Sequence, residues 1–207
     1  MTQPDAISRA MAVVDASLRE FFPDDYHCRC FYAAVGLASL LEADGFPSQV
    51  AGGDFLCAVI SKDGKRKNLQ GYGLSPTGAP THFWVRTRDL LLDLGPTYLP
   101  ARSSFPLAKL PVLRWELENP LPDYVDYSEA QRHVGIRLDD LELRKRVDAF
   151  RAHCQAKMQS CGESITLQAW ELSNHQSLVN AAKKGDPWTE AMLSFLRAGA
   201  KANVPRR

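Results

Sequence analysis

The sequence predicts an α+β fold in which one buried helix packs on an antiparallel sheet and further helices follow towards the C-terminus. Three observations support this fold class. Residues 31–41 are almost wholly apolar and rich in Ala and Leu, which is typical of a helix buried on nearly every face. Segments 49–60, 81–88 and 90–94 carry the alternation or the short apolar runs of strands. From residue 128 onward the composition shifts towards helix formers.

Length and composition indicate an ordinary globular protein. The chain has 207 residues, of which 45% are hydrophobic and 24% are charged, so disorder is not expected. Length alone permits one domain or two small ones. We expect a single domain over residues 1–207, with the N-terminal helix and the sheet in residues 1–125 and a mostly helical part in residues 126–200.

The charge balance excludes some classes of partner. Twenty-five basic and twenty-four acidic residues give a formal charge of +1, so no overall field attracts the chain to nucleic acid or to an anionic membrane. The first residues lack the pattern of a signal peptide, and no apolar run is long enough to span a bilayer. Five scattered cysteines are unlike a disulfide framework. We therefore expect a cytoplasmic protein with reduced thiols, and the sequence carries no signal for an oligomeric state.

Local signals place the elements in order. Apolar residues at steps of four and three predict an amphipathic helix over residues 5–22. The buried helix begins close to Cys28 or Cys30, and Gly45 and Pro47 end it. A strand is expected over residues 49–60, in which Gly52-Gly53 marks a bulge or a close backbone approach, and a hairpin turn follows at Asp63 and Gly64.

The remaining segments are assigned in the same way. Residues 68–80 lack apolar periodicity and are interpreted as a loop that forms a lid or a substrate-binding rim. Prolines forbid a long helix in residues 101–125, where residues 112–117 are expected to form the last strand of the core sheet. Helices are expected over residues 138–158, over residues 174–184 with Gly185 as the stop, and from Pro187 to residue 198.

The buried helix begins with a cysteine, and this position suggests a cysteine nucleophile. The unpaired amides and the dipole at a helix N-terminus favour a thiolate, which is how a fold prepares a cysteine nucleophile. Such a nucleophile needs a histidine to exchange the proton and a third group to orient the imidazole. Two adjacent antiparallel strands would carry His82 and Asp93 side by side. Asp89 is the rival third group, but its position in the turn should direct it to solvent.

These residues carry a resemblance to a known superfamily. Cys30, Ala34, the Gly45-Phe46-Pro47 turn, Val50, Gly52, the His82-Phe83-Trp84-Val85 strand and Asp93 occur in the order and spacing of the core of that superfamily. Residues 26–97 thus resemble the transglutaminase-like branch of the papain-like cysteine peptidases, and they are similar to small bacterial families of uncharacterised domains within it. The spacing to Gly45 selects Cys30 over Cys28. The chain departs from the family pattern at Cys28-Arg29, where Gly or Trp is usual before the cysteine, and at Phe83, where Ala is usual.

The resemblance implies a papain-like, transglutaminase-like core and a cysteine-dependent acyl transfer. Cys30 would be the nucleophile, His82 the proton carrier and Asp93 the orienting group, and the substrate would be a peptide or a small amide or ester. Such chemistry requires no cofactor. Around the triad we expect His27 and Cys28 to line the entrance, Tyr72 to lie on the rim and Trp84 to form a pocket wall, so that these four residues bind the substrate.

Two alternatives remain open from the sequence. One is a metal site, for which His27, Cys28, Cys30, Cys154, Cys161, His153 and His175 supply potential ligands. The Cys-x-Cys spacing is tighter than that of structural zinc sites, and no second close pair completes four ligands, so we predict no metal. The other alternative is a non-catalytic binding module that keeps the fold and uses the three triad residues only for structure.

Overall fold

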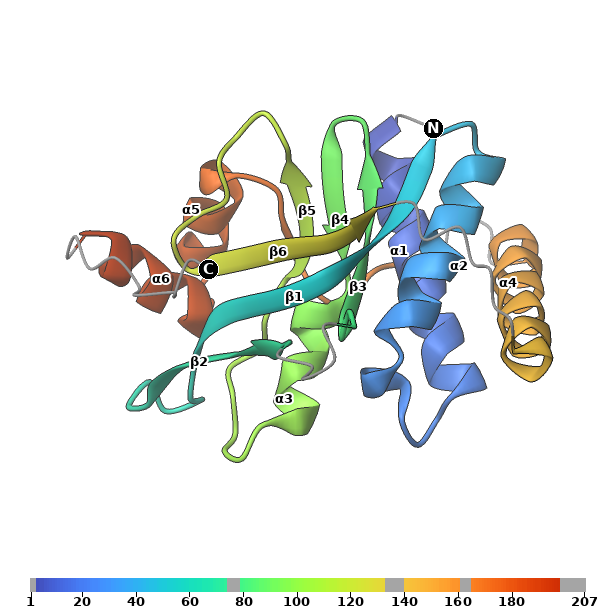
Figure 1. Cartoon of the computed structure of the whole chain (residues 1–207). Coiled ribbons are helices and arrows are strands. Elements are labelled where there is room, and N and C mark those ends of the chain that lie inside the picture. Colours follow the sequence, from blue (N-terminus) through green and yellow to red (C-terminus); the bar gives the residue numbers. More distant parts are fainter. Residues whose placement is uncertain (1–2, 74–78, 133–139, 161–164, 198–207) are drawn as a thin grey trace.

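The computed structural model describes residues 3–73, 79–132, 140–160 and 165–197. It shows an α+β structure in which a curved, largely antiparallel sheet lies between two groups of helices (Figure 1). One group contains α1 (Gln3–Phe21), α2 (Cys30–Ala43) and α4 (Leu141–Ser160). The other contains α5 (His175–Lys183) and α6 (Pro187–Arg197). The shorter helical segments are η1 (Tyr26–Cys28), η2 (Gly95–Tyr98) and α3 (Leu99–Arg102).

The sheet is organised around one long strand. It consists of β1 (Ser48–Ile60), β2 (Lys67–Tyr72), β3 (His82–Thr87), β4 (Leu90–Asp93), β5 (Val112–Glu116), β6 (Val125–Arg132) and β7 (Glu171–Leu172). Along one edge of β1, residues 48–53 pair with β3 and residues 55–60 pair with β2. The opposite edge pairs with β6 over residues 51–57. The sheet continues from β3 through β4 and β5, all antiparallel, and ends with the parallel strand β7.

The first hydrophobic core surrounds α2. This helix packs against α1, α4 and β3, so the apolar residues on all its faces are covered. At Gly36 a Cβ atom would lie 2.8 Å from Cε1 of Phe150 on α4, so glycine permits the two helices to approach closely.

Within the described ranges, no helix is both long enough and apolar enough to cross a bilayer.

The second core covers the other face of the sheet. Large buried side chains from the sheet, among them Phe55, Trp84 and Trp115, pack there with Leu178 of α5 and Trp188 of α6. The indole Nε1 of Trp188 donates a 2.8 Å hydrogen bond to the carbonyl oxygen of Ala58 on β1. The two cores therefore share one sheet, which fixes the C-terminal helices to the first strand.

Several elements agree with the sequence-based expectations. Helices α1, α4, α5 and α6 and strands β1, β3, β4 and β5 form close to their expected positions. The pairing of β1 with β6 shifts register between Gly52 and Gly53, where the bulge was expected. The turn after β1 contains Gly64 at φ 73°, which is typical of the expected Asp-Gly turn. The expected rim residues 74–78, Cys161 and the residues after 197 lie outside the described part of the chain.

The structure corrects three expectations about the sheet. Residues 67–72 form β2 and are not a loop. Within this strand, Gly71 allows β1 to approach closely, because a Cβ there would lie 1.8 Å from the carbonyl oxygen of Phe55. The sheet does not end at residue 117, since β6 follows and β7 adds a parallel strand. Finally, β6 is an edge strand with mostly exposed polar residues, so its composition did not distinguish it from a helix.

Candidate active site

Cys30 lies at the N-terminus of α2, as its first residue. The preceding 3-10 turn η1 redirects the chain after α1, and Arg29 at the N-cap position is paired with Asp25 and stacks over the Phe22 ring at 4.9 Å. No side chain caps the helix. The first amides of a helix have no partner within it, so this end can donate hydrogen bonds to a negatively charged group.

His82 and Asp93 meet at one end of two adjacent strands. His82 is the first residue of β3 and Asp93 is the last residue of β4, and the antiparallel pairing of Val85 with Leu92 brings these ends together. The Nε2 atom of His82 lies 2.6 Å from Oδ2 of Asp93. Both side chains are buried, with exposures of 0% for His82 and 3% for Asp93. A buried charge of this kind is stable only when it is paired and hydrogen-bonded.

Asp93 receives two further hydrogen bonds. The hydroxyl group of Tyr127 on β6 donates to Oδ2 at 2.6 Å, and the backbone amide of Gly95 donates to Oδ1 at 2.7 Å. Three donors therefore fix the carboxylate between β6 and η2. This arrangement holds Asp93 in one orientation and directs its Oδ2 atom to the imidazole.

The second nitrogen of the imidazole has no partner among the described residues, and Cys30 lies close to the same ring. Nδ1 of His82 is buried and makes no hydrogen bond with another residue in the described part of the chain. The Cys30 thiol lies next to the start of β3, with Sγ 3.8 Å from the carbonyl oxygen of Thr81. Interaction with Cys30 also contributes to the raised pKa of His82. Asp93 therefore holds Nε2 and leaves Nδ1 free, while Cys30 acts on the same ring.

The charge state of His82 follows from these contacts. Burial by itself would lower the pKa of the imidazole, but the carboxylate of Asp93 and, to a smaller extent, Cys30 raise this pKa from 6.5 to about 10. His82 is therefore protonated at neutral pH. A protonated imidazole beside a thiol stabilises the thiolate form and can return a proton to a leaving group.

Aromatic rings and a glycine fix the plane of the imidazole. The Tyr72 ring stacks on His82 with centroids 4.8 Å apart and an interplanar angle of 15°. On β1, Phe55 packs at 5.4 Å. A Cβ atom at Gly95 would lie only 2.3 Å from Cε1 of His82, so no other residue type fits there without a shift. The ring can rotate little in this environment.

The four residues expected to bind substrate occupy different environments. Cys28 is exposed and His27 is partly exposed, both in η1 just before Cys30. Tyr72 lies on β2, and its hydroxyl group donates to the carbonyl oxygen of Gly95 at 3.4 Å. Trp84 is only 1% exposed and lies in the second core, on the sheet face opposite α2. Of these four residues, only His27 and Cys28 are substantially exposed to solvent.

Two residues of the site were missed in the sequence, whereas the rival Asp89 lies where the sequence placed it. Tyr127 lies in a segment that was assigned to the helical part of the chain, and no local pattern distinguishes it. Gly95 follows Asp93 by two residues and was interpreted only as part of the exit from the sheet. Asp89, the rival third group, is exposed in the turn between β3 and β4. Its side chain is therefore directed away from His82.

No group of three or more His, Cys, Asp or Glu residues that could hold a metal ion occurs among the described residues. The remaining thiols of the described ranges, Cys57 and Cys154, are buried, and burial raises the pKa of Cys154 to about 11. Comparison of the chain with protein-family models, with curated proteins and with solved structures finds no match.

Proposed function

We propose that this chain is a papain-like, transglutaminase-like enzyme that performs acyl transfer at an amide or ester carbonyl. The observation that carries the proposal is the buried His82–Asp93 pair, whose carboxylate is fixed by Tyr127 and Gly95, whose Nδ1 atom is left without a partner among the described residues, and whose imidazole interacts with Cys30. The hydrogen bonds from Tyr127 and Gly95 stabilise the buried carboxylate, and they also fix the tautomer and orientation of the imidazole, as a proton carrier requires.

The reaction follows from these positions. The Cys30 thiolate attacks the carbonyl carbon and forms an S–C bond, while the developing oxyanion is stabilised by the backbone amide of Cys30 at the uncapped end of α2. The C–N or C–O bond to the leaving group breaks as Nδ1–H of His82 donates its proton to the departing amine or alkoxide. Water or an amine then gives up a proton to Nδ1, attacks the thioester and releases Cys30. Asp93 keeps the imidazolium stable throughout the cycle.

A non-catalytic binding module is the second candidate. It is favoured by the complete burial of His82 and by the lack of a hydrogen bond between Nδ1 and Cys30 in the described structure. In that case the imidazole and the carboxylate would serve as a buried ion pair that joins β3, β4 and β6. The two functions differ in the reactivity of Cys30.

Alkylation with limiting iodoacetamide at neutral pH distinguishes them. In a Cys28→Ser background, which removes the exposed neighbouring thiol, intact mass and peptide mapping should show Cys30 modified first. Replacement of His82 by Gln should slow this modification about tenfold or more. Asp93→Asn provides a second variant in case the Gln variant does not fold. Equal labelling of all accessible thiols, or an unchanged rate in both folded variants, would support the binding module.

A further inference from the structure

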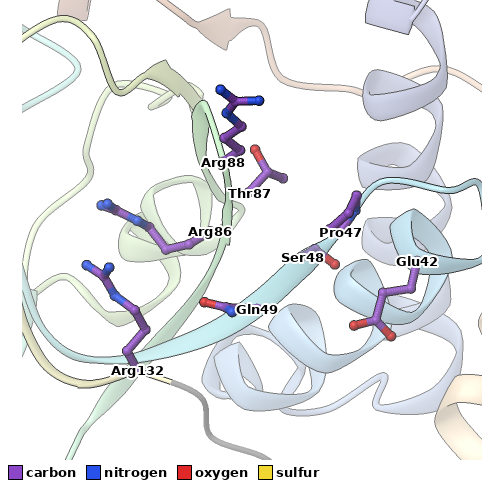
Figure 2. A pocket seen from close by; sticks show the side chains of 8 residues that line it. All are labelled: Glu42, Pro47, Ser48, Gln49, Arg86, Thr87, Arg88 and Arg132. Atoms are coloured by element: carbon purple, nitrogen blue, oxygen red, sulfur yellow. The ribbon is translucent and has the colours of Figure 1, made fainter.

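A cavity lies at the opposite end of β3 from His82. It has a volume of about 450 Å³ and is lined by residues of α2, the start of β1, the end of β3 and the end of β6 (Figure 2). This volume falls within the range of small-molecule sites, about 300–1,000 Å³. Three arginines line the cavity, namely Arg86, Arg88 and Arg132, against one acidic residue, Glu42.

This cavity is separate from the candidate active site. His82, Trp84 and Arg86 alternate along β3 and therefore share one face of the sheet. Arg86 lies four positions after His82, which corresponds to about 13 Å along a strand. The buried side chain of Trp84 fills the face between them. A ligand in the cavity would not reach Cys30 by this route.

The sheet register brings two guanidinium groups to the same face. Arg86 pairs with Gln49 across β1 and β3, and Arg132 pairs with Ala51 across β1 and β6. Figure 2 shows the side chains of Arg86 and Arg132 extending to the same side, whereas the carboxylate of Glu42 lies on the other side of β1. An anion near the two guanidinium groups would therefore not lie beside Glu42.

Arg86 lacks a direct counter-ion. No ion pair or hydrogen bond joins its guanidinium group to another residue of the described ranges, although the side chain is partly buried. Burial lowers the pKa of Arg86, as does the charge of Arg132, and Glu129 offsets these effects only in part. Arg132 itself is paired with Glu129 at 2.5 Å. Since an arginine stays charged at neutral pH, Arg86 retains a positive charge that Glu129 offsets only in part and that no direct ion pair within the described ranges neutralises.

The geometry points to a phosphate group, and we propose that this cavity binds a small phosphate ester through Arg86 and Arg132. The guanidinium fork of Arg86 can donate to two oxygens of a phosphate group, and Arg132, whose Nε and Nη2 atoms are bonded to Glu129, can add a hydrogen bond from Nη1. Arg88, which is 94% exposed and only weakly paired with Asp89, contributes charge at the rim. The cavity volume leaves room for the alcohol part of an ester beyond the phosphate itself.

Thermal-shift and calorimetric titrations with inorganic phosphate, phosphoserine and acetate, at constant ionic strength, test this proposal. Both phosphates should stabilise the wild-type protein more than acetate does, and tighter binding of phosphoserine would identify the ester as the ligand. Arg86→Gln and Arg132→Gln should each weaken phosphate binding about tenfold, the loss expected for one charge-assisted contact. Arg132 is exposed, so its replacement should not impair folding.

Two controls separate this site from other effects. Lys65→Gln removes one positive charge from the exposed turn after β1 and should leave phosphate binding unchanged. Cys30→Ser should also leave it unchanged, so the result is independent of the proposed acyl transfer. The proposal is wrong if phosphate stabilises no more than acetate. It is equally wrong if Lys65→Gln weakens binding as much as Arg86→Gln does.

Discussion

At the scale of single residues, the proposed chemistry depends on the buried pair of His82 and Asp93. Asp93 accepts hydrogen bonds from His82, Tyr127 and the amide of Gly95, so its position depends on three separate segments. The imidazole in turn depends on Asp93, because burial alone would lower its pKa and remove its charge. The pair therefore couples the stability of the fold to the protonation of one ring.

The stability contribution of this pair should depend on pH. The pKa of His82 is raised from 6.5 to about 10 in the folded state, chiefly by Asp93, which outweighs the opposing effect of burial. A raised pKa means that the contribution is fully present below pH 6.5 and is lost as the pH rises towards 10. Urea unfolding of the wild-type protein and of Asp93→Asn should show a difference in unfolding free energy that is larger at pH 6 than at pH 10. A difference independent of pH would contradict the assigned charge on His82.

At the scale of elements, the site depends on how closely short segments pack under the imidazole. The 3-10 turn η2 follows β4 directly and passes beneath the ring of His82. Its first residue, Gly95, both donates to Asp93 and leaves space for the ring. Helix α2 meets a similar requirement at Gly36, where the Phe150 ring of α4 approaches. Glycines at these two positions serve close packing and not turn formation.

Replacement of Gly95 by Ala tests this packing. The added Cβ would lie 2.3 Å from Cε1 of His82 and 3.0 Å from Oδ1 of Asp93, so the ring must move. Overpacking of this kind should lower the unfolding free energy by about 1–3 kcal/mol. It should also slow the alkylation of Cys30.

Gly185→Ala is the matched control for this variant. Gly185 has φ 79° and an open environment far along the chain, at the end of α5. Its replacement should cost about 1 kcal/mol in stability because alanine disfavours that backbone conformation. The alkylation rate of Cys30 should remain unchanged in this control. If Gly95→Ala also leaves the alkylation rate unchanged, the ring of His82 does not assist the thiol.

At the scale of the whole molecule, two cores on opposite faces of one sheet hold the candidate site at the ends of the interior strands β3 and β4. The first core fixes α2 and hence Cys30, and β3 carries His82 between the two cores. The second core binds α5 and α6 to the sheet through Trp188 and Leu178. The candidate site therefore depends on residues before and after position 125, since Tyr127 on β6 donates a hydrogen bond to Asp93 on β4.

The parts that could be predicted from sequence are those with strong local patterns. Such patterns occur in the apolar run of α2, the Asp63-Gly64 turn and the alternation in β3. They were sufficient to place Cys30 at the start of a helix and His82 and Asp93 on adjacent strands. Tyr127 could not be predicted, because its role depends on the pairing of β6 with β1, which is distant in sequence. The cavity of Arg86 and Arg132 depends on the same pairing and was missed for the same reason.

Capture of an acyl-enzyme tests the proposed catalysis most directly. The Cys28→Ser protein would be mixed with p-nitrophenyl acetate, quenched in acid and mapped by mass spectrometry, in parallel with its His82→Gln and Asp93→Asn variants. The proposed mechanism predicts a burst of about one equivalent of nitrophenolate and an acetyl thioester on Cys30 that then hydrolyses, with both reduced in the variants. Acetylation of Cys30 at the same rate in folded variants, or acetylation of other residues only, would contradict it.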